Sequence, residues 1–469
     1  MTEYLMKEGW NMANGIKQGL ESVLDSYVPL CLALALVILL LTGVGDVRIT
    51  SLAGLLLCGA GLTRDSVRVD PWVLFPLILY DLASMASSYA AYGNIVDGYG
   101  AMHALFPVVY LLVCGLEEHE LRLLKRCCVL LAGGIGAAGI GSYVFQAVVR
   151  GRVGRMSGLL GNSNATGIFL VVGWFALLHC TEEDKERNRA VFLLWLEPVL
   201  LTALAMTLSM GSFLAMAVGT GALLIQKSRE LSRREAFRYT CRLLARVVLG
   251  MGMGVLFYLA GARTSVPWVC LPLLAYEVAV TLCWKKFGRF LEAFPRMAFT
   301  ISAMGILVAA AAVLLRPGAA ATFAERLEMM QSGLSYLTRS PLFGVGPFRW
   351  RLLDMNDGGK YFNTWHIHNI PIHIGVEMGW IAMAMIVLIG LRVLFRKTTP
   401  ALRAGTAAFL FHNLIDTSFF YLGITAFTLA AAGGPQKDGR KTEGPALKLI
   451  FGLFAGLFVY SLYHGIRST

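Results

Sequence analysis

The chain has 469 residues, of which 57% are hydrophobic and 15% charged, and its apolar residues gather in long blocks. This composition excludes an ordinary soluble globular protein. The net charge of +12 does not indicate a nucleic-acid partner, because most Lys and Arg residues fall in alternate loops, as in the cytoplasmic loops of membrane proteins. The nine Cys residues show neither disulfide nor zinc-binding spacing.

The apolar blocks predict transmembrane helices. A helix needs roughly 20 apolar residues to cross a bilayer, and strands are excluded because open sheet edges are not tolerated in lipid. We therefore predict an all-α polytopic membrane protein of about 13–15 transmembrane helices, organised as a single membrane domain over residues 1–469. The N-terminus is expected in the cytoplasm, without a cleavable signal peptide. Clear blocks occupy residues 28–44, 159–178, 193–208, 297–315 and 374–391.

Polar residues mark the entrance of the block at 159–178. Arg155 is followed by Asn162, Ser163 and Asn164, a run that can cap a helix or expose backbone donors to an anion. By itself this pattern is a weak signal for a binding site.

The longest connection covers residues 316–370, and the charge pattern makes it an extracytoplasmic loop. Apolar residues recur along it at steps of four and three, which predicts an amphipathic helix on the outer membrane surface. Thr322 and Glu325 have the spacing of a capping box at the start of that helix. The apolar residues are Phe323, Leu327, Met330, Leu334 and Leu337.

This loop also carries cationic and imidazole side chains. Guanidinium groups match phosphate oxygens, so we expect Arg326 to bind an anion, whereas Arg349 has lipid headgroups as an equal alternative. His368, at the entrance of the next span, is a candidate general base, because a neutral imidazole can take a proton from a hydroxyl. A plain hydrogen-bonding role is the alternative, and His366 and His373 are rivals for the catalytic assignment.

Several ionisable residues fall inside predicted spans. Charges in lipid are costly, so such residues face a polar cavity or one another. For His412 and Asp416, at the mouth of one pair of spans, a structural hydrogen-bonding role is favoured. The full set is Asp81, Glu197, Glu277, His412 and Asp416.

Five pieces of sequence between residues 155 and 416 occur in a characteristic order. They are Arg-Met-Ser-Gly at 155–158 leading to Gly-Asn-Ser-Asn-Ala-Thr-Gly at 161–167, Thr-Leu-Ser at 207–209, Arg326, Ser-Pro-Leu-Phe-Gly-Val-Gly-Pro at 340–347, and His-Asn at 368–369 followed by Glu-Met-Gly-Trp-Ile-Ala at 377–382. In this order they resemble the O-antigen ligase and O-antigen polymerase family. The combination of the Pro-Leu-Phe-Gly-Val-Gly turn with His-Asn and Glu-x-Gly is the most specific part.

The resemblance implies metal-independent transfer of a glycan from undecaprenyl diphosphate to an acceptor hydroxyl, with no cofactor, on the outer face of the cytoplasmic (inner) membrane. The acceptor can be a glycan, a lipid or a protein, and ligase and polymerase activities stay equally open. The catalytic residues implied are His368 and Arg326. The substrate-binding residues implied are Arg155, Asn162, Asn164, Arg349 and Asn369.

The chain departs from the family pattern at Met210, where the family has an Arg that binds the diphosphate, and Arg155 or Arg263 are the candidate substitutes. Ser163 also replaces the usual Pro. Two other functions stay open. One is a transporter or flippase for the lipid-linked saccharide or another anion, and the other is a catalytically silent family member in envelope assembly, which the Met210 departure favours.

Overall fold

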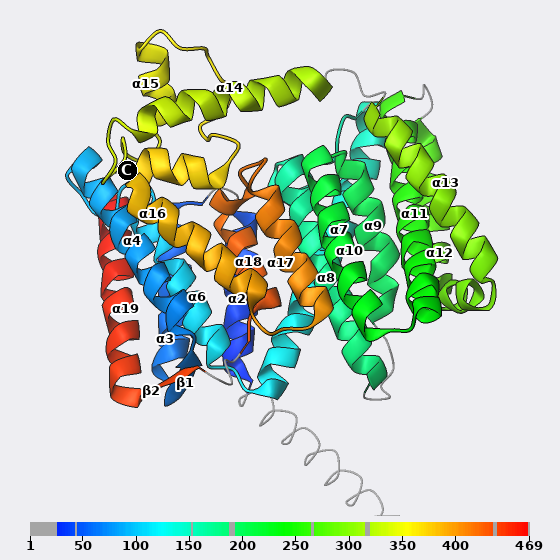
Figure 1. Cartoon of the computed structure of the whole chain (residues 1–469), viewed down its shortest axis with the longest axis horizontal. Coiled ribbons are helices and arrows are strands. Elements are labelled where there is room, and N and C mark those ends of the chain that lie inside the picture. Colours follow the sequence, from blue (N-terminus) through cyan, green and yellow to red (C-terminus); the bar gives the residue numbers. More distant parts are fainter. Residues whose placement is uncertain are drawn as a thin grey trace, which may run out of the picture.

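The computed structural model describes residues 26–42, 45–151, 153–186, 193–263, 267–314, 319–434 and 439–467. Within these ranges the chain is almost entirely helical (Figure 1). The expectations for the N-terminus concern residues outside this part of the chain. The helices up to the middle of the chain are α2 (Tyr27–Leu41), α3 (Val47–Leu62), α4 (Pro71–Tyr92), α5 (Gly100–His103), α6 (Leu105–Cys114), α7 (Glu118–Arg150), α8 (Ser163–Glu186), α9 (Leu196–Thr207), α10 (Met210–Glu230) and α11 (Arg233–Arg263).

The second half continues with α12 (Cys270–Ala293), α13 (Pro295–Leu314), α14 (Ala319–Leu337), α15 (Trp350–Asn356), α16 (Ile370–Phe395), α17 (Pro400–His412), α18 (Leu422–Ala432) and α19 (Gly444–Arg467). Short 3-10 turns are η1 (Gly158–Leu160), η2 (Leu193–Trp195), η3 (Pro267–Val269) and η4 (Ser418–Phe420). The sheet found among the described residues has two short antiparallel strands, β1 (Ser66–Val69) and β2 (Arg440–Glu443), with Ser66 opposite Glu443.

Among the described residues, eight helices are long and apolar enough to cross a membrane, namely α4, α7, α8, α10, α11, α12, α16 and α19. Six shorter apolar segments accompany them, in α2, α3, α5–α6, η2–α9, α13 and α18. The prediction of an all-α polytopic membrane protein is thereby confirmed, and the total number of spans stays a prediction. Helices satisfy their own backbone hydrogen bonds, which is what lipid requires.

Most successive helices of the bundle run in opposite directions, so the connections gather on two faces of the bundle (Figure 1). One face carries α14 and α15, together with the connections after α4, α7 and α17, and is called the α14 face below. The opposite face carries β1 and β2 and is called the sheet face.

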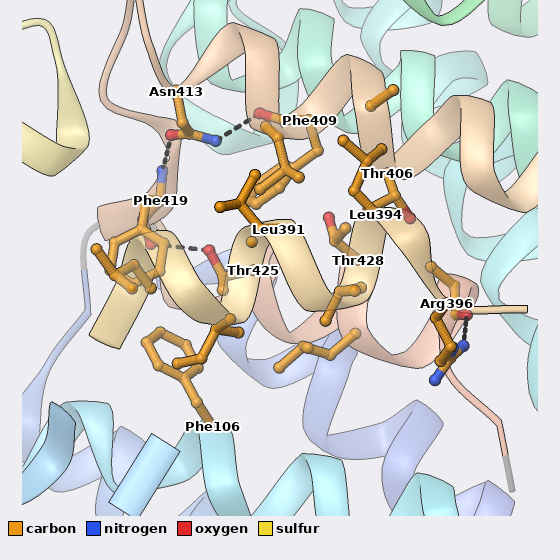
Figure 2. Close-up of a pocket in the computed structure, with 18 of the residues that line it drawn as sticks. Phe106, Leu391, Leu394, Arg396, Thr406, Phe409, Asn413, Phe419, Thr425 and Thr428 are labelled. Carbon is orange, nitrogen blue, oxygen red and sulfur yellow. Dashed lines mark hydrogen bonds between the residues drawn. The ribbon is translucent and has the colours of Figure 1, made fainter. Parts of the chain in front are cut away.

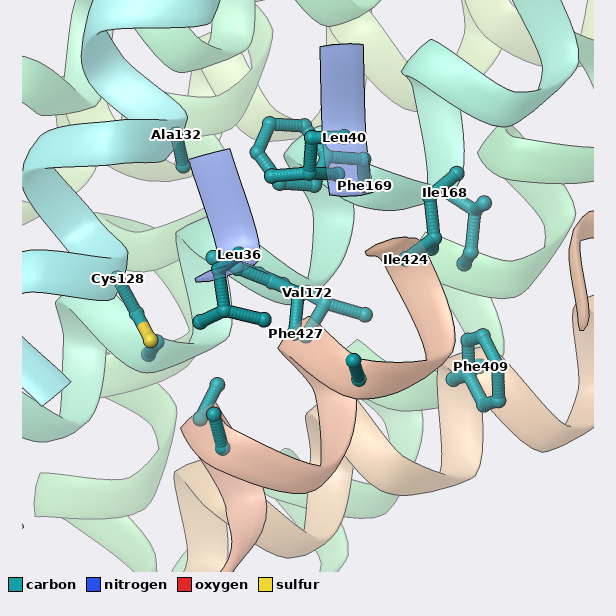
Figure 3. Close-up of a cluster of buried hydrophobic side chains, with 14 of the residues drawn as sticks. Leu36, Leu40, Cys128, Ala132, Ile168, Phe169, Val172, Phe409, Ile424 and Phe427 are labelled. Atoms are coloured by element: carbon teal, nitrogen blue, oxygen red, sulfur yellow. The ribbon is translucent and has the colours of Figure 1, made fainter. Parts of the chain in front are cut away.

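The packed centre of the bundle surrounds α8. Phe169 and Trp174 of α8 are fully buried, and the ring of Phe169 packs at a tilt against that of Phe427 of α18, with centroids 4.6 Å apart. Figure 3 shows this cluster, in which side chains of α2, α8 and α18 interlock. In contrast, Leu282 of α12 and Leu453 of α19 are more than 60% exposed, as expected of helices whose outer sides face lipid.

Helix α16 is broken near its first third, at Gly379, where φ is 89° and ψ is 172°. The break leaves backbone groups without helical partners, and the turn at 340–347 supplies new ones. Val345 N donates to Val376 O at 2.8 Å, Gly346 N donates to Glu377 O at 3.0 Å, and Trp380 N donates to the backbone oxygen of residue 341 at 2.8 Å. Non-helical backbone within a membrane protein is stable where it is satisfied in this way.

Side-chain contacts complete this docking. The Glu377 carboxylate is fully buried and accepts hydrogen bonds from Phe348 N at 2.8 Å and Trp350 N at 3.3 Å. A side chain on Gly344 would lie 2.2 Å from the Glu377 backbone. The Pro-Leu-Phe-Gly-Val-Gly and Glu-x-Gly motifs of the sequence are therefore the two halves of one structural contact.

The amphipathic helix predicted in the long loop is present as α14, lying across the end of the bundle (Figure 1). The predicted capping position was wrong, because α14 begins at Ala319 and Thr322 lies inside it. Leu337 packs against the protein, whereas Phe323 and Leu334 are 62% and 48% exposed. The exposed part of the apolar stripe is thus available to a membrane surface.

Candidate functional site

The candidate site lies on the α14 face, where segments far apart in sequence meet. Arg155 lies in the connection between α7 and α8, Asn164 in the first turn of α8, and Asp416 after α17. Arg326 projects from α14, and His368 precedes α16. These five residues are called the Asp416 cluster below.

The Asp416 carboxylate is the centre of the cluster. Its Oδ2 accepts a hydrogen bond from Asn164 Nδ2 at 2.8 Å and lies 3.3 Å from Arg326 Nη2 and 4.0 Å from His368 Nδ1. Its Oδ1 accepts from Thr417 N at 2.8 Å. The Asp416 side chain is 6% exposed, and that of Arg326 is 21% exposed. One largely buried carboxylate therefore holds an amide and a guanidinium, with an imidazole close by.

Arg155 extends the cluster on the side of α8 and α9. Its Nη2 donates to Asn164 Oδ1 at 2.9 Å, and its Nε donates to Thr207 O at 2.9 Å. Asn162 supports this arrangement without reaching Asp416, because its Oδ1 caps α8 by accepting from Asn164 N at 2.8 Å and from Ala165 N at 3.1 Å. In the run Asn-Ser-Asn, Asn162 thus caps α8 and Asn164 donates a hydrogen bond to Asp416.

His368 is mostly buried, with 18% of its side chain exposed. Burial lowers the pKa of His368 below its ordinary value, and the nearby Asp416 carboxylate acts in the opposite direction. Its Nδ1 has no hydrogen-bond partner among the described residues. A lowered pKa favours the neutral form of the imidazole, which is the form that can accept a proton.

The two rival imidazoles lie behind the cluster. His366 is 9% exposed and packs against Phe420 and His373, with ring centroids 4.3 and 5.0 Å away. Burial lowers the pKa of His366 well below its ordinary value. His373 Nδ1 accepts from Ile367 N at 3.2 Å, and its Nε2 lies 3.2 Å from a Glu377 carboxylate oxygen. Both residues hold the fold together, and of the three only His368 faces Asp416.

Asn369 and Arg349, two of the predicted binding residues, make no hydrogen bond to Asp416 in the described part of the chain. Asn369 caps α16, with its Oδ1 accepting from Ile372 N at 3.0 Å and its Nδ2 donating to Leu414 O at 3.1 Å. It therefore ties the start of α16 to the segment that carries Asp416. Arg349 is exposed and lies 5.5 Å from the ring centroid of Tyr92, and the structure does not bring it to Asp416.

Met210, at the family's usual Arg position, is the first residue of α10. A side chain on the following Gly211 would lie 3.3 Å from His412 Nε2 and 3.8 Å from Asp416 Oδ2, so the first turn of α10 borders the cluster. Arg155, bound to the Thr207 carbonyl, lies beside the turn that leads into Met210. Of the two candidate substitutes, Arg155 therefore belongs to the cluster, whereas the Arg263 side chain lies outside the described part of the chain.

An apolar groove begins beside the cluster and runs through the bundle between α16 and α17, with α6 and α18 as its floor (Figure 2). Its volume is about 440 Å³. Ile370, Asn413 and Leu414 line the end nearest Asp416, and Arg396 and Gly434 line the other end. This α16–α17 groove is therefore an apolar space, and Ile370 and Leu414 at its near end lie two positions along the chain from His368 and Asp416. Among the described residues, no group of three or more His, Cys, Asp or Glu side chains is placed to hold a metal ion.

The fold and the site define a polytopic helical membrane protein with an Arg, Asn and His cluster at one face, next to an apolar groove. Residues 198–387 match the family model described as O-antigen ligase. This match supports the assignment of the chain to the O-antigen ligase/polymerase family, as the motifs predicted. No curated protein matches the chain.

The matched segment contains Arg326 and His368 but ends before Asp416 and begins after Arg155 and Asn164. Sequence reasoning gave Asp416 a structural role, because nothing along the chain links it to residue 164 or 326. Its short distance along the chain from His412 and Asn413, at the mouth of one pair of spans, was the signal that could have identified it.

Proposed function

We propose that this protein is a membrane glycosyltransferase that moves a glycan from undecaprenyl diphosphate to an acceptor hydroxyl, without a metal ion, on the extracytoplasmic side of the cytoplasmic membrane. The observation that carries this proposal is the position of the Asp416 cluster at the end of the α16–α17 groove. A lipid diphosphate needs both elements, a cationic site for its head and an apolar channel for its tail.

The donor would bind with its diphosphate at Arg326 and Arg155 and its prenyl chain in the groove. These two guanidinium groups would neutralise the charge that builds on the leaving diphosphate. Arg326 is held by Asp416 and Arg155 by Asn164, so both are oriented before the substrate arrives. Such preorganised charges stabilise a transition state without the cost of reorganisation.

The acceptor hydroxyl would be activated by His368. Asp416 faces Nδ1 of this imidazole, which leaves Nε2 to take the proton. As the acceptor oxygen attacks the anomeric carbon, the bond from that carbon to the diphosphate breaks and the electron pair leaves with the phosphate. The hydroxyl proton ends on His368. This chemistry is the same for a ligase and a polymerase, which differ only in the acceptor.

The charge distribution supports the sidedness of this proposal. Basic residues such as Arg64, Arg122, Lys125 and Lys227 belong to the ends of helices on the sheet face, and positively charged loops favour the cytoplasmic side. The α14 face would then be extracytoplasmic. We propose the whole of residues 1–469 as one membrane domain whose acceptor is a glycan, a lipid or a protein.

The test is transfer by the purified protein in detergent. An undecaprenyl-diphosphate glycan and candidate acceptors are incubated in excess chelator with the wild type, His368→Ala and Arg326→Ala. Arg339→Ala is the matched control, because Arg339 belongs to the same loop but pairs with Asp357. The proposal predicts transfer by the wild type and the control, and at least about a 100-fold loss in the two site variants.

Two other outcomes would contradict this proposal. Transfer that requires added divalent metal would refute the metal-independent mechanism. Donor binding without transfer to any acceptor would favour a transporter or a catalytically silent protein, and Met210→Arg is then the variant that asks whether the missing Arg is the cause.

A further inference from the structure

An aromatic and cationic surface on the α14 face is not used by the proposed chemistry. The Arg351 guanidinium carbon lies 4.7 Å from the ring centroid of Tyr361 and 4.7 Å from that of Trp365. Tyr361 is 58% exposed and Trp365 is 47% exposed. These three residues are called the Trp365 platform.

The platform has a rigid base. Trp350, which precedes Arg351, is fully buried, and its Nε1 donates to Ser332 Oγ of α14 at 3.1 Å. Trp350 also stacks on Phe362, which follows Tyr361, with ring centroids 5.6 Å apart. On the other side, Ile367 is fully buried. The exposed rings are therefore flanked along the chain by the buried residues Trp350, Phe362 and Ile367, which hold them in place. Little conformational freedom would then be lost when a ligand binds.

Arg351 differs from Arg326, Arg339 and Lys360, three other cations of the same loop, each of which pairs with a carboxylate. Arg339 pairs with Asp357 and Lys360 pairs with Glu328. No carboxylate partner of Arg351 is found among the described residues, and its buried Nε has no hydrogen-bond partner there. Stacking orients the guanidinium, and its two terminal NH2 groups have no hydrogen-bond partner among the described residues.

This combination fits a saccharide. A sugar ring presents C–H groups on its faces and hydroxyl groups around its rim. Aromatic rings pack against the C–H faces of a sugar, and the N–H donors of a guanidinium can bind its hydroxyl groups. Binding sites for small polar molecules commonly combine aromatic surface with a few fixed polar groups.

A membrane surface is the competing partner for exposed Trp and Tyr residues, which gather at the headgroup level. The position of the platform argues against it. Arg351 belongs to α15, which lies on the side of α14 that points away from the bundle (Figure 1). Trp365 is three residues from His368, so their Cα atoms are at most roughly 11 Å apart. The platform is thus within reach of a glycan whose end lies at His368.

We propose that Arg351, Tyr361 and Trp365 form a saccharide-binding platform that holds the glycan of a substrate beside His368. This inference rests on the proposed transferase function for its role, but the binding itself does not require transfer. Because donor and acceptor can both carry glycans, the shared chemistry is the saccharide, and the experiment separates the two sources.

The experiment compares Trp365→Ala, Trp365→Phe and Arg351→Gln with Trp268→Ala. Trp268 is a matched control, since it is 59% exposed on the connection between α11 and α12 and no cation stacks on it among the described residues. The probe is the oligosaccharide released by mild acid from the surface polysaccharide of the source cells. Its binding to detergent-purified protein is measured by saturation-transfer NMR and titration. Thermal unfolding confirms that each variant is folded.

We expect Trp365→Ala and Arg351→Gln to weaken oligosaccharide binding at least about fivefold, with Trp365→Phe intermediate and Trp268→Ala unchanged. In transfer assays the KM of one substrate should rise while kcat changes little. A raised acceptor KM assigns the platform to the acceptor, and a raised donor KM assigns it to the donor glycan.

The inference is overturned if folded Trp365→Ala binds the oligosaccharide like the wild type, or if it weakens only the association of the protein with phospholipid vesicles. Failure of the transferase proposal looks different. In that case wild-type protein binds the oligosaccharide through the platform but transfers nothing.

Discussion

The ion pair between Arg326 and Asp416 allows a quantitative test of the proposed diphosphate site. Their 3.3 Å separation corresponds to a gross attraction of roughly 5 kcal/mol at an effective dielectric constant of about 20. Residues in such contact show net coupling energies of about 0.5–3 kcal/mol. If Arg326 is removed, Asp416 keeps its charge next to the expected diphosphate and repels it. Part of the damage in Arg326→Ala should therefore come from Asp416.

A double-mutant cycle measures this coupling in kcat/KM for glycan transfer. Arg326→Ala should lower it about 100- to 1,000-fold, and Asp416→Asn less, because the amide keeps an oxygen for Arg326. The double variant should be roughly 2- to 150-fold faster than the product of the single effects predicts. The matched control is the cycle of Arg339 and Asp357, an exposed pair of the same loop, which should leave transfer unchanged. Strict additivity at Arg326 and Asp416 would refute the idea that this carboxylate acts on the substrate through the guanidinium.

Three further predictions concern the base, the broken helix and the groove. Because burial lowers the pKa of His368 and Asp416 opposes this shift, the acid limb of kcat/KM should lie below pH of about 6.5 and move to still lower pH in Asp416→Asn. A move to higher pH would contradict the assignment. Gly379→Ala places a Cβ 2.1 Å from a backbone oxygen of the docked turn at a φ of 89°, so the unfolding temperature in detergent should fall by more than that of Gly252→Ala, where a Cβ meets nothing within 4 Å. The backbone strain alone is worth about 1–3 kcal/mol. Gly390→Trp, which fills the α16–α17 groove, should raise the KM of a long-chain prenyl donor while sparing a short-chain analogue, and an equal effect on both donors would argue against a tail channel.

The sequence by itself determined the membrane class and the presence of α14. These features follow from local properties of the chain. The thickness of a bilayer sets the length of an apolar block, and a repeat of three and four residues defines one side of a helix. Arg326 and His368 could be proposed on the same basis, because both lie in one long loop that carries cations against the usual bias.

Only the tertiary structure decided which polar groups meet. Asn164 and Asp416 are separated by 252 residues and yet share a hydrogen bond, and Arg326 reaches Asp416 across 90 residues. The same packing separates His368 from His366 and His373, brings Arg155 next to the turn before Met210, and turns Asn369 into a helix cap. The physical reason lies in the lipid environment. A transmembrane helix is apolar on the side that faces lipid and on the side that faces protein, so its sequence carries little information about its neighbours. The contacts that assemble the site are fixed by how the helices fit together, and not by any pattern along the chain.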